Sequence, residues 1–340
     1  MFSTRPFSVL CLLLAGLLAG CGRSPAPVTG AAAAPVKIRL LTDWYPQAEH
    51  GGFYQALAKG YYREAGLDVE IVGGGPGATV GQKMIAGQGE IGMSASDWII
   101  INVNSGLPFV MVGASMQHDP QAILVHKDSP VRSFKDLDGR RVMGVPGSNW
   151  IDYLSARHGI NFTIIPMNYS LAQFIADKNF IQQCYITNEP FFLRQNGVES
   201  RALLIADSGY DPYRVMFTTQ RFAREQPQAV RAFVAASIRG WEEFITGDPA
   251  PAKALIAARN TQMSEAFMDF TIATLRERRL ITGEAGADER TGQLSRRRLQ
   301  EQIELLARLK IIAAPMPVDR IALLDMLPAA TQAAADRTAP

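Results

Sequence analysis

Residues 42–54 read Thr42-Asp43-Trp44-Tyr45-Pro46-Gln47-Ala48-Glu49-His50-Gly51-Gly52-Phe53-Tyr54, and this polar and aromatic stretch decides the fold. The apolar run Val36 to Leu41 before it predicts a buried strand, and helical apolar spacing follows it directly. In an open α/β sheet, ligands bind beyond the carboxyl ends of strands, next to helix N-termini. We therefore expect four side chains of this stretch to contact a small molecule: Asp43, Trp44, Tyr45 and His50. The alternative is an ordinary turn around one buried Trp.

The alternation of strand and helix continues along the chain and predicts an α/β fold with parallel sheets and helices on both faces. Apolar runs predict further strands at 67–72, 90–94, 109–114, 121–126, 162–167, 180–186, 202–206 and 213–219. Asp97 stands where it can cap the helix that follows the strand at 90–94. From residue 228 onward the pattern is helical.

This order predicts two α/β lobes whose strand ends face one ligand cleft. We expect residues 36–120 to form the first part of lobe 1 and residues 121–215 to form lobe 2. Residues 216–332, mostly helical, are expected to return as a C-terminal extension that covers lobe 1.

Length and composition indicate a globular protein. Its 340 residues suffice for two domains, and 47% apolar with 19% charged residues is the composition of a folded chain. The formal net charge is only +2, which favours no polyanion as partner and argues against a nucleic-acid role. We expect a monomer that binds a small molecule.

The first 20 residues are expected to be an export signal. Arg5 precedes an apolar core, Phe7 to Ala19, that is too short to span a bilayer. The sequence Leu18-Ala19-Gly20-Cys21 resembles a bacterial lipobox, which implies cleavage before Cys21, acylation of its thiol and anchoring on the periplasmic side of a membrane. The alternative is a plain secretory signal with an incidental cysteine. Residues 21–35, rich in Ala and Pro, are expected to be a tether.

Cysteine and histidine usage predicts neither a disulfide nor a metal site. With Cys11 in the signal and Cys21 acylated, Cys184 is the one free thiol expected in the mature protein. Three histidines, His118, His126 and His158, are far apart and lack ligand spacing.

Several segments carry a resemblance to a known family: Asp43-Trp44-x-Pro46-x-x-x-His50-Gly51-Gly52-Phe53-Tyr54, Lys59-Gly60-Tyr61-Tyr62-x-Glu64-x-Gly66-Leu67-Asp68-Val69, Gly89-Glu90-Ile91-Gly92, residues 133–144 and Asn188-Glu189-Pro190. Together, over about residues 36–330, the chain resembles the solute-binding proteins of the sulfonate, nitrate and thiamine-pyrimidine class. The resemblance implies a type II periplasmic-binding fold, closure of two lobes over a ligand, and delivery to an ABC permease with its ATPase. The opening motif is most similar to the thiamine-precursor branch, whose members bind an aminopyrimidine.

An aminopyrimidine site needs flat rings to stack on and oxygen atoms that accept its N–H hydrogens. The candidate rings are Trp44, Tyr45, Trp150, Tyr185 and Tyr213, and the candidate acceptors are Asp43 and Glu189. A sulfonate or nitrate site would instead use hydroxyls such as Ser96 and Ser148, together with a cation. Two acids in one cleft would repel an anion, which favours a neutral or cationic heterocycle. Core packing for the tyrosines, and a first-turn helix role for Glu189, remain alternatives.

Two other function classes stay open. In fungal enzymes of this superfamily, the histidine that aligns with His50 is consumed to build the pyrimidine, and a cysteine-rich motif binds iron. The matching region here offers only Cys184, so we expect no enzyme activity, no catalytic residue and no cofactor. A Gly-rich stretch, Gly73 to Ala78, superficially matches a dinucleotide fingerprint but suits a tight turn equally well. The remaining class is a sensor or scaffold lipoprotein without transport.

Overall fold

The computed structural model describes residues 34–284 and 289–329. Both sheets belong to one compact unit, which begins at Pro35. The expected export signal and Cys21 lie outside the described residues. Within those residues, no helix combines the length and the apolarity that crossing a membrane requires.

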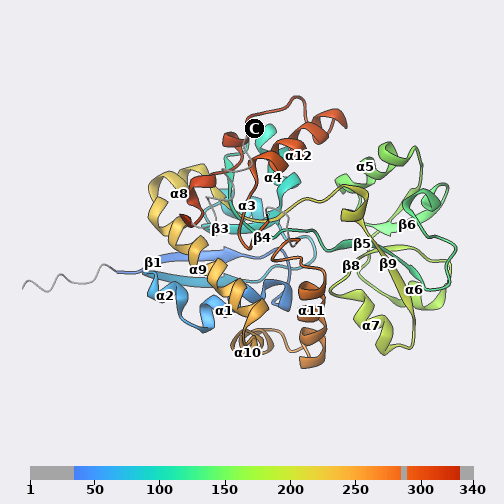
Figure 1. Ribbon diagram of the computed structural model, residues 1–340, viewed down its shortest axis with the longest axis horizontal. Coiled ribbons are helices and arrows are strands. Elements are labelled where there is room, and N and C mark those ends of the chain that lie inside the picture. The colour runs from blue at the N-terminus through green and yellow to red at the C-terminus, as the bar shows by residue number, and fades with distance from the viewer. Residues whose placement is uncertain (1–33, 285–288, 330–340) are drawn as a thin grey trace, which may run out of the picture. The chain divides into compact units, whose positions relative to one another are not determined.

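The first sheet has the strand order β2-β1-β3-β10-β4 (Figure 1). Its strands are β1 (Val36–Leu41), β2 (Leu67–Val72), β3 (Ile91–Ala95), β4 (Phe109–Met116) and β10 (Arg214–Thr219). All eight residues of β4 are buried, as expected for a strand covered on both faces. Strands β1 and β2 pair in parallel from Val36 opposite Leu67 to Leu41 opposite Val72.

The second sheet has the order β7-β6-β8-β5-β9. Its strands are β5 (Gln121–His126), β6 (Arg141–Gly144), β7 (Thr163–Pro166), β8 (Gln182–Tyr185) and β9 (Ser200–Leu204). Two segments connect the sheets, residues 117–120 between β4 and β5 and residues 205–213 between β9 and β10.

The expectation of parallel pairing holds for β1 with β2 and β3 and for β6 with β7 and β8, but it is wrong for β5 and β10. Strand β10 runs antiparallel to both β3 and β4, and β5 runs antiparallel to both β8 and β9. Both are the strands that the chain enters on passing from one sheet to the other. A parallel neighbour requires a crossover, usually a helix, within the same sheet, and a strand that arrives from another sheet is free of that constraint.

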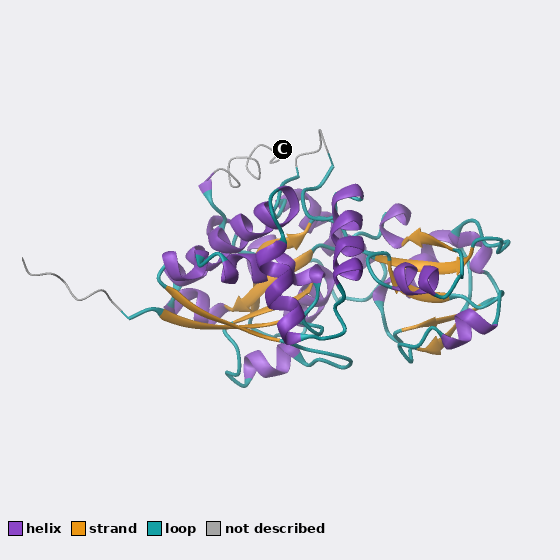
Figure 2. Cartoon of the chain, turned by 90° about the horizontal axis from the view of Figure 1, so that it is seen from below, coloured by secondary structure: helices purple, strands orange, loops and turns teal. Residues whose placement is uncertain are grey.

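The helices surround the sheets (Figures 1 and 2). Those of the first part of the chain are α1 (Gly51–Ala58), α2 (Tyr61–Glu64), α3 (Val80–Ile85), α4 (Ser96–Asn104), α5 (Asn149–His158), α6 (Ala172–Ala176) and α7 (Glu189–Gln195). The later ones are α8 (Gln220–Glu225), α9 (Pro227–Thr246), α10 (Ala250–Arg259), α11 (Glu265–Glu277) and α12 (Arg296–Arg308). Short 3-10 turns are η1 (Ala48–His50), η2 (Phe134–Leu137), η3 (Ile205–Ser208), η4 (Val318–Arg320) and η5 (Leu324–Met326).

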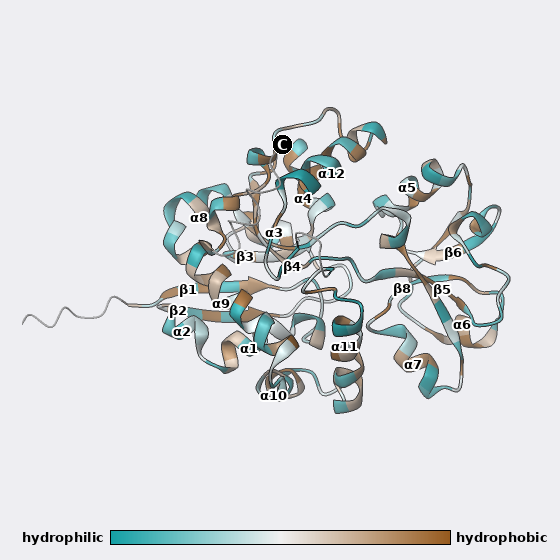
Figure 3. Ribbon diagram, viewed as in Figure 1, coloured by the Kyte–Doolittle hydropathy of each residue, from teal (hydrophilic) through white to brown (hydrophobic). Residues whose placement is uncertain are grey.

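Helices of the C-terminal part pack against the first sheet and its helices. Helix α9 contacts α1, α2 and β4, while α12 contacts α4. Helix α12 is strongly amphipathic, with Leu299, Ile303 and Leu306 buried and much of its surface polar, as the teal colouring shows (Figure 3).

The Gly51-Gly52 pair of the opening motif has a packing role. Both glycines lie in α1, where a Cβ on Gly51 would clash with the Phe244 ring and one on Gly52 with the Trp241 indole. Across the contact, a Cβ on Gly240 of α9 would clash in the same way with the carbonyl oxygen of Gly52. The glycines let two helices meet backbone to backbone, which fixes η1 and the loop before it against the core.

Candidate functional site

A cavity of about 550 Å³ lies between residues of the two sheets. On the side of the first sheet, loops supply Asp43, Trp44, Gln47, Gly75, Gly77, Ala78 and Thr79, η1 supplies Glu49 and His50, α4 supplies Trp98, and β3 supplies Met93, Ser94 and Ala95. From the second sheet and its loops come Val145, Met167, Tyr169, Gln183, Cys184, Tyr185, Asn188 and Glu189. Strand β10 adds Arg214. The volume falls within the range of about 300–1,000 Å³ typical of small-molecule sites.

An ion pair lies against the cavity wall on the β10 side. The Arg214 guanidinium contacts Asp43 Oδ2, and His50 Nε2 lies 3.3 Å from Asp43 Oδ1. Burial favours the neutral form of Asp43, but Arg214 and His50 outweigh burial and lower the pKa of this carboxyl to about 2. Asp119 Oδ2 lies 3.9 Å from the other Arg214 nitrogen, Nη1. The one guanidinium in the described lining is therefore flanked by two acids.

Glu49 is a buried acid that joins the two sheets, with 5% of its surface exposed. Gln47 Nε2 donates to Glu49 Oε2 at 2.5 Å, and the hydroxyl of Thr187, in the loop after β8, donates to Oε1. The carbonyl oxygen of Thr187 accepts from Thr271 of α11. Burial, reinforced by nearby Glu189, raises the pKa of Glu49 to about 8, so this carboxyl is predominantly neutral at pH 7.

Glu189 and Tyr185 face the cavity from the second sheet. Glu189 is the first residue of α7, and its Oε2 accepts from the Tyr185 backbone N–H at 2.8 Å. Burial raises the pKa of Glu189 to about 7 and also raises the pKa of the Tyr185 hydroxyl. At pH 7 the Glu189 carboxyl is therefore only partly ionised, and the Tyr185 hydroxyl is neutral.

Aromatic rings from both sheets meet at the edge of the cavity. The Trp44 ring lies 5.3 Å from the ring of Tyr169, which follows β7, and 5.5 Å from the ring of Tyr45. Tyr169 is 55% exposed and Tyr45 is 50% exposed. Because Tyr169 both lines the cavity and faces solvent, it marks the cavity mouth.

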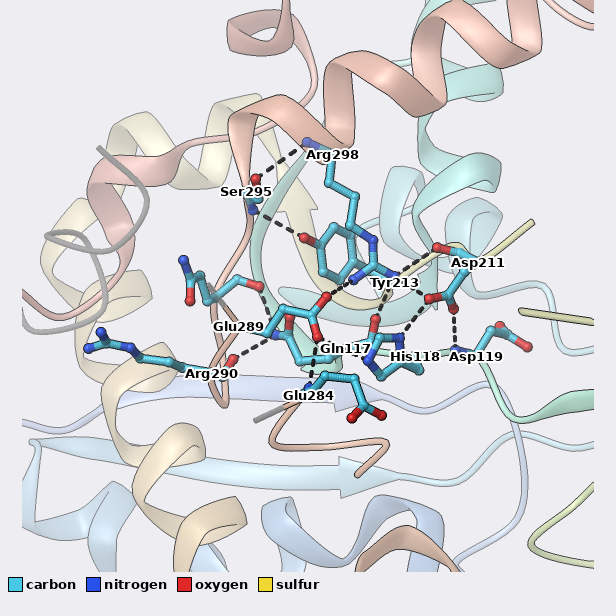
Figure 4. A network of polar contacts seen from close by, with 12 residues as sticks. Gln117, His118, Asp119, Asp211, Tyr213, Glu284, Glu289, Arg290, Ser295 and Arg298 are labelled. Atoms are coloured by element: carbon cyan, nitrogen blue, oxygen red, sulfur yellow. Dashed lines mark hydrogen bonds and ion pairs between the residues drawn. The ribbon is translucent and has the colours of Figure 1, made fainter. Parts of the chain in front are cut away.

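A charged network ties the two connecting segments together (Figure 4). His118 Nδ1 lies 2.6 Å from Asp211 Oδ2, and its Nε2 lies 3.0 Å from Glu289 Oε2. Arg298 of α12 donates to the carbonyl oxygen of Gln117 at 2.7 Å and to Asp211 Oδ2 at 2.8 Å. Burial opposes protonation of His118, but the two carboxylates raise its pKa to about 9. Both connections are thus anchored to one helix.

The sequence model of the family described as NMT1/THI5 like matches residues 47–252. This chain belongs to the NMT1/THI5-like family. Its expected family is therefore confirmed.

Relatives in this family carry different names. The riboflavin-binding protein RibY of Chloroflexus aurantiacus is 26% identical over 68% of this chain and 72% of its own length. The formylaminopyrimidine-binding protein of Halalkalibacterium halodurans is 25% identical over 71% of this chain and 76% of its own. A 4-amino-5-hydroxymethyl-2-methylpyrimidine phosphate synthase of Legionella pneumophila is 24% identical over 67% and 75%.

The fold is shared with a solved structure, the alkanesulfonate-binding protein SsuA from Xanthomonas axonopodis pv. citri bound to MOPS. The TM-score is 0.63 at 16% identity, covering 86% of this chain and 99% of that one. The expected periplasmic-binding fold is confirmed.

Of the ten predicted contacts, five line the cavity: Asp43, Trp44, His50, Tyr185 and Glu189. The other five have contacts elsewhere. Tyr45 stacks edge-on against Trp44 outside the lining, and Ser148 Oγ donates to the Val145 carbonyl. Trp150 is buried against Phe162 beside the second sheet.

Ser96 and Tyr213 form a buried pair next to α12. Ser96 Oγ donates to Gln302 Oε1 at 2.6 Å and accepts from the Tyr213 backbone N–H at 3.0 Å. The Tyr213 ring packs under the Arg298 guanidinium at 3.9 Å. Both side chains therefore support the fold around the connecting segments.

The predicted capping role of Asp97 is wrong. Ala95 occupies the N-cap position of α4, and Asp97 is the second residue of the helix, where its Oδ1 accepts from the Trp98 backbone N–H at 2.8 Å. Its Oδ2 accepts from Asn149 Nδ2 at 2.8 Å and from the Tyr210 hydroxyl. Asp97 thus links α4 to α5, which packs beside the second sheet. Both partners of Oδ2 are more than 50 residues away along the chain, so a local sequence pattern does not reveal them.

Sequence reasoning missed three lining residues that matter chemically, namely Glu49, Tyr169 and Arg214. Glu49 stands inside the opening stretch, and Tyr169 follows a predicted strand, so both carried the signal that selected their neighbours. Arg214 was hidden by the parallel expectation: because β10 is antiparallel, its first residue lies at the edge where β3 ends, as the pairing of Arg214 with Ala95 shows.

Proposed function

We propose that this protein is the solute-binding component of an ABC importer and that its cavity takes a flat, uncharged heterocycle, in the first place an aminopyrimidine of the thiamine-precursor type. Ligand would bridge the two lobes and favour the closed form through its better fit there. We place one boundary between the lobes after residue 120 and the other after residue 215, so that the second boundary falls within β10 (Arg214–Thr219).

The charge balance of the cavity carries this proposal. Arg214 is the only Lys or Arg in the described lining, and its charge is offset by Asp43. Glu49 is predominantly neutral at pH 7, and Glu189 titrates close to that pH. A sulfonate or nitrate would need a cation that is not already paired with an acid, and the described lining offers none.

The hydrogen-bonding groups suit an aminopyrimidine. Carboxyl oxygens of Asp43 and Glu189 can accept from an exocyclic amino group, while His50 offers a further polar atom. Among the described residues none is a hydrogen-bond partner of His50 Nδ1, although this atom is buried. Trp44 and Tyr185 supply aromatic surface. A buried polar atom without a partner is costly, so a ligand hydrogen bond there would be favourable.

A flavin is the second candidate. RibY is named for riboflavin, and the formylaminopyrimidine-binding protein is named for a smaller ring; both ligands are flat heterocycles. The cavity volume of about 550 Å³ leaves room beyond a single pyrimidine ring.

We propose binding rather than pyrimidine synthesis, although several relatives are named synthases. In the described part of the chain, no three or more His, Cys, Asp or Glu side chains are grouped to hold a metal ion, and the one cysteine is Cys184. Mass spectrometry after incubation with iron and pyridoxal phosphate tests this, since an altered His50 would support the enzyme.

We further propose that the protein is exported as a monomer, cleaved before Cys21 and anchored through lipid on that residue. The lipobox-like sequence supports this. Metabolic labelling with a palmitate analogue should mark the wild type and leave a Cys21→Ser variant unlabelled.

Thermal shift and calorimetry over a defined panel test the ligand. The panel contains formylaminopyrimidine, 4-amino-5-hydroxymethyl-2-methylpyrimidine, riboflavin, methanesulfonate and nitrate. A ligand at 100 times its Kd stabilises the folded state by about 2.7 kcal/mol, which raises Tm by several degrees. We expect a pyrimidine, or secondarily riboflavin, to do so. Stabilisation by methanesulfonate or nitrate alone would overturn the ligand assignment.

A further inference from the structure

We propose that Tyr169 and Trp44 form an aromatic gate across the cavity mouth, and that Tyr169 contacts the outer face of the bound solute. The solute contact rests on the proposed function, whereas the gate itself rests on the contact between the two rings.

The gate joins loops that belong to different sheets. Trp44 follows β1 in the first sheet and Tyr169 follows β7 in the second, and their rings lie 5.3 Å apart at an interplanar angle of 43°. Both residues line the cavity. Rotation of one sheet away from the other about the connecting segments would separate these rings and open the mouth.

The backbone of Tyr169 holds the ring at this position. Its φ is +58°, a left-handed conformation that three non-glycine residues of the described chain adopt. The other two, Arg279 and Lys310, follow the ends of α11 and α12, where this conformation commonly terminates a helix. Tyr169 lies in a loop instead, where an unusual conformation is a sign of a functional constraint.

Neighbouring side chains stabilise this loop. Asn168 Oδ1 accepts from the Ser170 backbone N–H at 3.0 Å, and Ser170 Oγ accepts from the Ala172 N–H at 3.2 Å. These side-chain hydrogen bonds fix the loop backbone around Tyr169, whose side chain remains 55% exposed. Together with Trp44 this ring forms an aromatic pair at the mouth, and Tyr and Trp rings are enriched where proteins contact a partner.

Cys184 provides a readout that needs no ligand. It lines the cavity from β8, is 2% exposed, and is the only free cysteine among the described residues. A small thiol reagent such as methyl methanethiosulfonate must enter the cavity to reach it. Burial raises the pKa of the Cys184 thiol and so slows its modification in every variant. At a fixed pH, the ratio of modification rates between variants therefore reports how often the mouth opens.

The test uses the full chain with Cys11→Ser and Cys21→Ser, so that Cys184 is the one thiol. An aromatic pair contributes enough that Tyr169→Ala should raise the Cys184 modification rate about two- to tenfold. Tyr169→Phe keeps the ring, so its Cys184 modification rate should equal that of the protein with Tyr169. Tyr45→Ala is the matched control, because Tyr45 is equally exposed and touches the same Trp44 ring from outside the lining.

The gate is refuted if Tyr169→Ala leaves the rate unchanged, or if Tyr45→Ala raises it equally. Stopped-flow dissociation of formylaminopyrimidine tests the solute contact: Tyr169→Ala should accelerate release about two- to tenfold and Tyr45→Ala should not. Equal release from both variants would overturn the contact. If no panel solute protects Cys184, the proposed function fails while the ligand-free rates still decide the gate.

Discussion

Replacing Asp43 by Asn should destabilise the protein and change which ligands it prefers. Asp43 contacts Arg214, and its pKa is lowered from 3.8 to about 2. A shift of nearly two pKa units corresponds to about 2 kcal/mol of favourable interaction with the ionised carboxyl. The side chain is 29% exposed, so solvent screening keeps the cost at or below this figure, apart from the penalty of leaving Arg214 without its partner.

The pH dependence of this loss has a definite sign. The folded-state pKa of Asp43 is below its ordinary value, so the stabilisation is present above about pH 4 and disappears as the pH falls through about 2. Urea unfolding followed by circular dichroism should show Asp43→Asn to be about 2 kcal/mol less stable at neutral pH. The difference should shrink in acid.

A ligand assay separates this reasoning from a general loss of stability. With Asp43→Asn, Arg214 loses its contacting carboxylate and keeps only the more distant Asp119, at 3.9 Å, so more of its positive charge is left for an anion in the cavity. Methanesulfonate should therefore raise the Tm of the variant more than that of the wild type. Binding of an aminopyrimidine should weaken. Asp68→Asn, an exposed position on β2, is the control and should change nothing. A variant as stable as the wild type at neutral pH, with no new response to methanesulfonate, would refute the ion-pair argument.

Three further predictions concern other groups. Glu189→Gln should weaken aminopyrimidine binding by about tenfold and spare methanesulfonate, as calorimetry can measure, because it replaces a partly ionised carboxyl, which can accept through both oxygens, with a neutral amide that has one accepting oxygen. The carboxylates around His118 stabilise its protonated form, so this stabilisation should be present below about pH 6.5 and lost as the pH rises through about 9. The free energies of unfolding of the wild type and His118→Gln should therefore differ at pH 6, by up to about 3 kcal/mol more than they differ above pH 9. Glu289 contacts His118, and the lowered pKa of Glu289 reflects the same ion pair that raises the pKa of His118, so it contributes no separate stabilisation to this figure. Gly52→Ala should lower the Tm by several degrees through its clash with Trp241, whereas equal stability would contradict the helix contact.

Much of the fold was predictable because apolar periodicity reports burial directly. The run Val36 to Leu41 is the buried strand β1, and the helical pattern 228–245 lies within α9. Strand direction was not predictable, because a strand that crosses between sheets carries the same apolar pattern whichever way it runs.

The lining residues that directly follow the first strand were predictable from the sequence. Asp43, Trp44 and His50 follow β1 and line the cavity. Trp150 and Tyr213 also stand next to predicted strand or helix ends, yet both are at most 2% exposed and belong to the core. Position in a loop does not tell whether a ring faces inward or outward, since that depends on contacts from distant segments such as α12.

Arg214 shows how one missed strand direction alters a chemical conclusion. From the sequence, two acids alone appeared to make the cleft repel anions. In the structure, Arg214 brings a positive charge to Asp43, so simple repulsion no longer excludes an anion. What disfavours an anion is that this charge is already compensated, with Asp43 in contact and Asp119 at 3.9 Å. The preference for an uncharged ring therefore depends on an ion pair that a single substitution can break, and this is why Asp43→Asn is the most informative variant.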